Sequence, residues 1–260
     1  MLVRRPTDVI GTNKEMIRRA GDGCVNALRV LTKEDGCGFS ISDVYLQSGF
    51  SMELHYKNHA EINLILAGHV KVQDLTQGEH WKLNPGDAYL VGPKDRHHLS
   101  TNVNAHLISI FNPAILGNEQ HDSDGSLEPT GELPLAWKPP DGRRMYTIRA
   151  TDANQMIPVG DGHQGQRYLD IDGGFGLTVY THTLSVREDS ILLGKDHLGT
   201  SYVIEGEGTL EDTNTSDSWE IEPGCLYLVR QHDRCKVNVK TDIHLVTITN
   251  LEPKQFDYYP

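Results

Sequence analysis

The sequence predicts an all-β protein made of two tandem copies of one domain, and three observations support this prediction. Apolar residues come in short alternating bursts at 39–46, 62–68 and 69–75, each bounded by Gly, Pro, Asn or Asp. This pattern is typical of short antiparallel strands. Glycine and proline are frequent, with 25 and 12 residues among 260, which fits a chain with many turns. The third observation is an internal repeat.

The repeat relates the two halves of the chain by an offset of 138 residues. Residues 55–113 align with 193–251 without a gap, and 16 positions are identical, including Pro85-Gly86 with Pro223-Gly224. The stretch at 131–142 is rich in Pro and Gly and is predicted to be a linker. The predicted domains are therefore residues 1–130 and 143–260.

One minor helix is expected near the start of the chain. Thr12 and Glu15 have the spacing of a capping box at the start of the segment NKEMIRRA, which is followed by Gly21. Such spacing before a run that ends in glycine predicts a short helix.

Composition excludes several classes of partner. Lys and Arg total 24 against 36 Asp and Glu, so the net charge of −12 would repel nucleic-acid phosphates. The longest apolar run falls far short of the roughly 20 residues of a membrane span. The first residues lack a secretory pattern and the four cysteines form no CxxC pair, so we expect a cytoplasmic location.

The spacing of turn and polar residues in the first copy carries a family resemblance. Gly49 and His55 lead to a Glu61-x6-Gly68 element, which is followed by Pro-Gly-Asp at 85–87 and by a downstream histidine. This arrangement resembles the two motifs of the cupin superfamily, although Lys57 stands where many cupins carry a second histidine. The resemblance implies a bicupin, two tandem jelly-roll β-barrels. A generic β-sandwich with scattered histidines is the alternative.

Three polar residues of the first copy are candidates for a metal site. Strand alternation places Tyr89 on one face with Val91, while Glu61 lies on an earlier strand and His97 follows the later one. Inside a barrel these three side chains could converge, and three protein ligands with open positions describe a catalytic metal site. Taken singly, each also fits a core tyrosine, a strand carboxylate or a solvated histidine.

Three longer stretches make the resemblance specific. HYKNHAEINLILAGHVKV at 55–72, LNPGDAYLVGPKDRHHL at 83–99 and FNPAILGNEQHDSDG at 111–125 closely resemble ectoine synthase. That family is a group of single-domain cupins that close N-γ-acetyl-diaminobutyrate to a cyclic amidine with loss of water. The match runs from about Arg29 to Gly125. It implies a cyclising dehydratase, a hydro-lyase, which acts on an N-acylated diamino acid or a related amide.

The same resemblance implies roles for individual residues. One iron per chain would be held by Glu61, Tyr89 and His97. Proton transfers are assigned to Tyr56, Glu119 and His121, and substrate binding to a second set, namely Arg29, Ser42, Val44, His59, Phe111 and Pro113. For Arg29, a clamp on the substrate carboxylate and a structural role both remain open, because Arg167 recurs at the equivalent position. Val25 and Val44 depart from the family's Trp and Thr, so the exact substrate stays open.

The second copy has lost most of the predicted ligands. Gly199 and Cys235 stand at the positions of Glu61 and His97, and of the three ligands only the tyrosine is kept, as Tyr227. We expect a degenerate, metal-free cupin. A different metal held by His197 and Cys235 is the alternative. Because the family works as a homodimer, the fused pair is expected to form a pseudo-dimer within one chain, which itself is a monomer or a homodimer.

Two other functions remain open from the sequence. A three-ligand iron site in a bicupin also suits an oxygenase or isomerase acting on a small polar substrate. A bicupin without catalysis could bind a small molecule for regulation or storage. The retained ligands and the HD-containing tail at 121–122 favour an enzyme.

Overall fold

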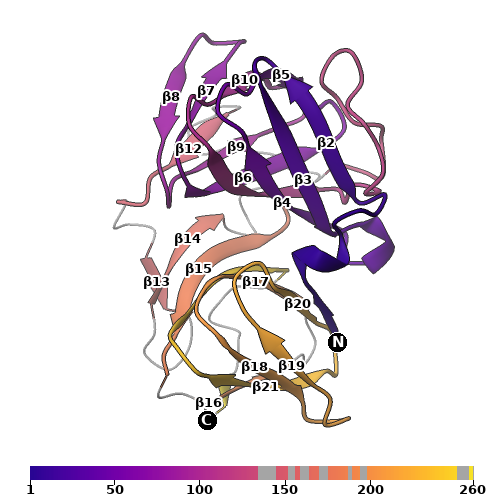
Figure 1. Cartoon of the computed structure of the whole chain (residues 1–260), viewed down its shortest axis with the longest axis vertical. Coiled ribbons are helices and arrows are strands. Elements are labelled where there is room, and N and C mark those ends of the chain that lie inside the picture. Colours follow the sequence, from indigo (N-terminus) through magenta and orange to yellow (C-terminus); the bar gives the residue numbers. More distant parts are fainter. Residues whose placement is uncertain are drawn as a thin grey trace. The chain divides into compact units, whose positions relative to one another are not determined.

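A computed structural model describes residues 1–133, 145–151, 156–158, 164–169, 175–186, 189–193, 198–250 and 258–259 (Figure 1). The chain divides into two compact units. The first unit comprises Pro6–Thr151 with Gly173–Phe175, and the second comprises Met1–Arg5, Asp152–Asp172 and Gly176–Pro260. Most of the predicted linker at 131–142 lies outside the described residues.

The first unit consists of two antiparallel sheets. Their strand orders are β12-β9-β6-β11-β4-β3-β2 and β5-β10-β7-β8. The strands are β2 (Glu15–Ala20), β3 (Gly23–Leu31), β4 (Ser40–Leu46), β5 (Ser51–His55), β6 (Ala60–Ala67), β7 (Val70–Asp74), β8 (His80–Leu83), β9 (Ala88–Val91), β10 (Arg96–Ser100), β11 (Ala105–Asn112) and β12 (Tyr146–Ile148). Two 3-10 turns accompany them, η1 (Pro6–Asp8) and η2 (Lys33–Asp35).

The second unit repeats this topology. Its sheets have the orders β1-β20-β17-β22-β15-β14-β13 and β19-β18-β21-β16-β23. The strands are β1 (Leu2–Arg4), β13 (Met156–Pro158), β14 (Gln164–Leu169), β15 (Thr178–Leu184), β16 (Asp189–Leu193), β17 (Gly199–Glu205), β18 (Gly208–Asp212), β19 (Ser218–Ile221), β20 (Leu226–Val229), β21 (Arg234–Val239), β22 (Ile243–Thr249) and β23 (Tyr258–Tyr259). Strands β15, β18 and β20 begin 138 residues after β4, β7 and β9, which confirms the predicted all-β bicupin.

In each unit, one edge strand comes from the half of the chain that the repeat predicts to form the other unit. Strand β1, at the start of the chain, pairs with β20 of the second unit, with Leu2 opposite Leu228. Strand β12, which follows the predicted linker, pairs with β9 of the first unit, with Tyr146 opposite Leu90. The two pairings occupy the same position in their sheets, at the edge beyond β20 and β9.

The core of the first unit lies between its two sheets. Alternation along β7 buries Val70 and Val72 and exposes Lys71 and Gln73, so one face of the strand contributes to the core. The core cluster draws on both sheets, with Val25 and Leu107 from the seven-stranded sheet and Leu83 and Leu99 from the other. Burying these apolar faces is the main driving force for the fold.

The predicted helix near the start is wrong, because this segment forms strand β2. Met16 is 4% exposed whereas Ile17 is 64% exposed, which is the two-residue period of a strand. Glu15 does accept the Gly11 amide, at 2.7 Å, but the bond closes a turn before the strand. Pairing with β3 then satisfies the backbone hydrogen bonds of this segment and brings Met16 into the core. The stabilisation from pairing and burial outweighs the local helix propensity.

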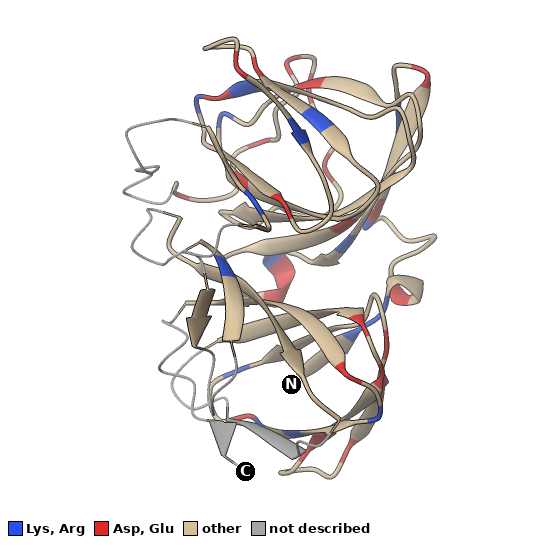
Figure 2. Cartoon of the chain, turned by 90° about the vertical axis from the view of Figure 1, so that its left-hand side faces the viewer, with Lys and Arg blue, Asp and Glu red and all other residues tan. Residues whose placement is uncertain are grey.

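Charged residues of both signs are interspersed on the side of the molecule seen in Figure 2. The loops and strand ends carry most of the acidic residues in this view, as expected where turns face water. Within the part of the chain that the structure describes, no helix is long and apolar enough to cross a membrane.

Candidate active site in the first unit

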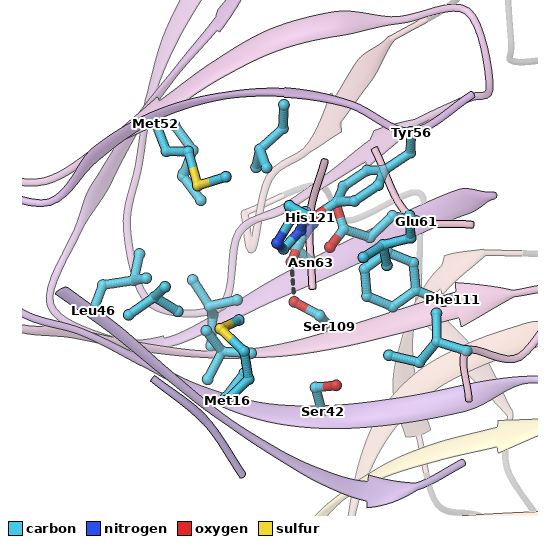
Figure 3. A pocket seen from close by; sticks show the side chains of 18 of the residues that line it. Met16, Ser42, Leu46, Met52, Tyr56, Glu61, Asn63, Ser109, Phe111 and His121 are labelled. Carbon is cyan, nitrogen blue, oxygen red and sulfur yellow. Dashed lines mark hydrogen bonds between the residues drawn. The ribbon is translucent and has the colours of Figure 1, made fainter. Parts of the chain in front are cut away.

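The first unit contains a cavity of about 60 Å³ among its core residues (Figure 3). Strands of both sheets provide the walls, with Glu61 and Asn63 from β6 and Leu99 from β10. Eight of the lining residues have polar or titratable side chains, namely Arg29, Ser42, Tyr56, Glu61, Asn63, Tyr89, Ser109 and His121. Small-molecule sites are typically such concave, mostly apolar cavities with a few convergent polar groups.

The three predicted metal ligands come from three strands and are all buried. Glu61, Tyr89 and His97 are 4%, 1% and 0% exposed. Glu61 and Tyr89 line the cavity and interact, since the Glu61 carboxylate contributes to raising the pKa of the Tyr89 hydroxyl. His97 enters from β10 of the opposite sheet, and its ring centroid lies 6.0 Å from that of Tyr89. The fold therefore places these three side chains near one another.

Unpaired polar atoms in this cluster fit a bound cation. Glu61 Oε2 and both ring nitrogens of His97 are buried without a hydrogen-bond partner among the described residues. Leaving such atoms unpaired is costly, and a coordinated metal ion would satisfy them. Burial raises the pKa of Glu61 to about 8 and lowers the pKa of His97 to about 3. His97 is therefore neutral at pH 7, which is the form of imidazole that binds a metal.

The composition of the cluster also limits the kind of metal site. Within the described ranges, no three His, Cys, Asp or Glu side chains lie together in a way that could hold a metal ion. The phenol oxygen of Tyr89 would have to serve as the third ligand beside Glu61 and His97. Two oxygens and one imidazole nitrogen form a mixed donor set that several first-row transition metals accept, iron among them.

Tyr56 and His121 form a hydrogen-bonded pair at the same end of the cavity. The Tyr56 hydroxyl lies 3.1 Å from His121 Nε2, and the Phe111 ring packs edge-on against Tyr56 with centroids 5.1 Å apart. Burial lowers the pKa of His121 to about 4 and raises the pKa of Tyr56 well above its usual value. Both groups are thus neutral at pH 7, with a hydrogen bond already formed between them.

Arg29 and Glu119 hold the loop that follows β11. The Arg29 guanidinium donates to the carbonyl oxygens of Gly117 and Glu119, at 3.0 and 2.7 Å. The Glu119 carboxylate accepts the amides of Leu116 and Gly117, at 2.8 and 2.6 Å. These bonds show a structural role for both residues. The predicted clamp of Arg29 and the predicted proton transfer by Glu119 remain predictions.

Glu119→Gln is expected to lower the free energy of unfolding by about 1–3 kcal/mol, because the amide nitrogen that replaces one oxygen cannot accept a backbone N–H. Denaturant unfolding of the metal-free protein measures the change. Glu128→Gln, the same substitution at an exposed position nearby, is the matched control. Equal stability of the two variants would contradict the structural role of Glu119.

The remaining predicted substrate residues divide into two groups. Ser42 and Val44 on β4 line the cavity together with Arg29 and Phe111. His59 and Pro113 do not belong to the lining residues. The His59 ring lies edge-on to Phe111, with centroids 6.1 Å apart, and its Nε2 is 3.0 Å from Thr130 Oγ1.

Sequence reasoning missed a polar pair in the cavity wall. The Ser109 hydroxyl donates to the Asn63 carbonyl oxygen, and the two side chains beside Glu61 oppose the rise in its pKa that burial causes. A signal for the pair was present, because strand alternation puts Asn63 on the face of Glu61 and Ser109 on the face of Phe111. The two residues line the cavity together with Glu61.

The second unit fills the corresponding positions with side chains that bond to one another. Thr247 stands at the position of Ser109, and its hydroxyl lies 3.0 Å from His182 Nε2 and 2.9 Å from Ser201 Oγ. Cys235 is buried at the position of His97. His197, which the sequence offers as an alternative ligand, lies outside the described residues.

Two jelly-roll units, the first with a mostly apolar cavity that contains a few polar groups, define a two-domain cupin. Known structures with this fold include an oxalate decarboxylase from Lactobacillus farciminis (TM-score 0.63, 12% identity, 96% of this chain and 85% of that chain). Another is the YlbA protein of E. coli (TM-score 0.67, 10% identity, 96% and 91%). The chain belongs to the ectoine synthase family, whose model, described as ectoine synthase, matches residues 1–130 and again 143–253.

Curated relatives support the family assignment. The L-ectoine synthase of Oceanobacillus iheyensis is 34% identical over 125 residues, which are 48% of this chain and 94% of the relative. That of Desulfosudis oleivorans is 36% identical over 129 residues, 49% of this chain and 97% of the relative. Each relative thus corresponds to about half of the present chain. Membership in this family makes the chain an enzyme of the lyase class.

Proposed function

We propose that the first unit is an iron-assisted cyclising dehydratase that closes an N-acylated diamino acid, or a related amide, with loss of water. The observation that supports this most directly is the buried cluster of Glu61, Tyr89 and His97 with its unpaired ligand atoms beside the cavity. Family membership favours the same reaction class, because the curated relatives are L-ectoine synthases. The second unit, with Gly199 and Cys235 at two ligand positions, is proposed to be metal-free.

The iron would be held by Glu61, Tyr89 and His97, and as a Lewis acid it would make the amide carbonyl more electrophilic. The chain's own groups then have to move protons. The attacking amine loses two protons, and the departing oxygen needs two to leave as water. A relay that takes up and returns protons is therefore sufficient.

The Tyr56–His121 pair suits this relay. His121 is neutral at pH 7, so its Nε2 accepts the hydroxyl proton of Tyr56 while the Tyr56 oxygen removes a proton from the substrate amine. The pair then returns this proton to the departing oxygen, and a second cycle of the relay carries the second proton from the amine to the same oxygen. Arg29 supplies a fixed positive charge in the cavity wall, which attracts the substrate carboxylate. Holding amine and carbonyl in one conformer adds the advantage of proximity.

The function is tested with the full chain loaded with ferrous iron under anaerobic conditions. N-γ-acetyl-diaminobutyrate is supplied, and mass spectrometry detects a cyclic product that has lost one water. Turnover without oxygen supports the dehydratase and excludes the oxygenase. The absence of any cyclised product from this and other N-acyl diamino acids would overturn the proposal and favour a binding protein.

Tyr56→Phe is expected to lower kcat by about 100-fold or more, because the proton relay loses its hydroxyl. Steady-state kinetics of the iron-loaded variant measures the loss. Tyr45→Phe is the control, since Tyr45 is 42% exposed and its hydroxyl bonds to Asp43, away from the cavity. Unchanged kcat in Tyr56→Phe would remove Tyr56 from the mechanism.

We place the enzyme in the cytoplasm. In the described part of the chain, no disulfide joins any of the four cysteines, Cys24, Cys37, Cys225 and Cys235. Free thiols are stable in a reducing compartment, whereas secreted proteins commonly join theirs in disulfides. The proposed partner of the enzyme is a small-molecule substrate, in keeping with the size of the cavity.

A further inference from the structure

The cavity of the first unit has two chemically different ends (Figure 3). Tyr56, Glu61 and His121 lie together at one end, beside Phe111. Met16, Leu46 and Met52 lie toward the other end, and the hydrogen-bonded Asn63 and Ser109 lie between the two. The polar end contains the groups that the proposed reaction needs.

The second end, which we call the apolar end, offers no hydrogen bond from a side chain. Met16 and Val25 come from the β2–β3 hairpin and are 4% and 7% exposed, and Leu46 on β4 is 2% exposed. Met16, Leu46, Met52 and the apolar lining residues that follow from them by cross-strand pairing are aliphatic or thioether, namely Met16, Val25, Ala27, Val44, Leu46, Met52, Leu99 and Leu107. Water here would have few partners, and an apolar cavity of this kind favours an apolar occupant.

Two flexible side chains make the apolar end adjustable. Met16 and Met52 stand on different strands, β2 and β5, and both reach the cavity. Methionine is unbranched and has three rotatable bonds, so it adapts to groups of different length at little cost. The volume of about 60 Å³ is therefore the space left with both methionines in their present rotamers.

The chemistry of an N-acylated diamino acid determines which part reaches this end. The amine and the amide carbonyl must lie at the polar end, where the proton relay is, and the carboxylate requires a positive charge. The acyl substituent is the one part without a polar atom. With the carbonyl at the polar end, this substituent would extend past Asn63 and Ser109 toward Met16.

We propose that the apolar end binds the acyl chain of the substrate, and that this chain is longer than acetyl. This inference rests on the proposed function and names its substrate class. Each methylene that leaves water for the apolar end should raise kcat/KM by about fourfold. The increase should continue until the chain meets the end of the cavity.

The test compares N-γ-acetyl-, propionyl- and butyryl-diaminobutyrate with the iron-loaded full chain, by kcat/KM and by calorimetric binding. The expected butyryl/acetyl ratio of kcat/KM is about 16. Val25→Trp fills the apolar end and should lower this ratio at least tenfold. Ile17→Trp adds the same bulk on the outward face of the same hairpin, where Ile17 is 64% exposed, and should leave the ratio unchanged.

The possible outcomes distinguish a failure of this inference from a failure of the proposed function on which it rests. Turnover of the acetyl compound with no gain for propionyl or butyryl overturns the acyl-chain proposal and leaves the dehydratase standing. If kcat/KM rises from acetyl to butyryl, and Val25→Trp removes this rise whereas Ile17→Trp does not, both the acyl-chain proposal and the dehydratase function are supported. Neither turnover nor binding of any of the three compounds overturns both. A ratio that responds equally to the two tryptophan variants assigns the effect to folding and overturns the role of the apolar end.

Discussion

Removing residues 1–5 is expected to destabilise the second unit and to leave the first unit unchanged. The deletion removes β1, which pairs with β20, and the side chains of Met1 and Val3, which pack against the core of the second unit. It also removes the bond from Arg5 to the Glu220 carbonyl, 3.0 Å long. Half-buried apolar side chains and ladder bonds contribute about 1 kcal/mol each, so the sum is about 3–5 kcal/mol. That is a large part of the stability of a domain.

Hydrogen exchange measured by mass spectrometry distinguishes the two units. Faster exchange is expected at 226–229 in β20, while 88–91 in β9 should keep its protection. Val3→Asp tests the same contact without shortening the chain. Ile10→Asp introduces the same charge at a position that is 55% exposed in the first unit and serves as the control. Equal exchange in both units after the deletion would show that β1 contributes nothing specific to the second.

The iron content is expected to be one per chain, held in the first unit. Glu61→Gln removes the carboxylate charge, and we expect it to weaken iron binding by more than about 100-fold, beyond the effect of losing an outer-shell partner. Cys235→Ser alters the equivalent region of the second unit and should leave the content at one. Metal analysis after dialysis measures both. Two irons per chain, or one iron retained by Glu61→Gln, would contradict the assignment.

The pH dependence of iron binding provides a second readout. The pKa of Glu61 in the metal-free protein is raised to about 8 by burial, so near pH 7 the carboxyl holds a proton that a metal ion must displace. Iron affinity should therefore fall as the pH is lowered from 8 toward 6, with proton release on binding. His97, with a pKa of about 3, stays neutral and contributes no titration in this range. Affinity independent of pH between 6 and 8 would mean that Glu61 is not a ligand.

Most of the fold could be predicted from two signals in the sequence, the alternation of apolar residues within strands and the internal repeat. Alternation within strands such as 70–74 is local, and the repeat reports the arrangement of whole units, so neither depends on the details of packing. The helix prediction for the segment 15–20 was wrong because it used only a local signal. Its capping signal is local, whereas its strand state depends on pairing with β3.

The exchange of β1 and β12 was hidden by the spacing of the repeat. Met1 and Arg5 match Met145 and Arg149 at an offset of 144, whereas the rest of the chain repeats at 138. A search at a single offset therefore passes over these strands. Nor does a one-dimensional pattern show which unit an edge strand joins, because either sheet offers free backbone groups.

For the site, motif resemblance and strand alternation identified the residues that face the cavity but not what they touch. Arg29 lines the cavity and Glu119 does not belong to the lining residues, yet the hydrogen bonds of both run to the backbone of the loop at 116–119. Such partners depend on loop conformation, which no spacing rule supplies. The contact between Tyr56 and His121 likewise joins residues 65 positions apart.

Strand β12 also bears on how such a gene can change after duplication. Arg149, just beyond β12, bonds to the Asp87 carboxylate at 2.9 Å, and the amide of Ala150 donates to the same group at 3.0 Å. Asp87 immediately precedes the strand that carries Tyr89. The second half of the gene thus encodes part of the support for the first half's chemistry. A deletion of the whole second copy would therefore remove these contacts to Asp87 from the first unit.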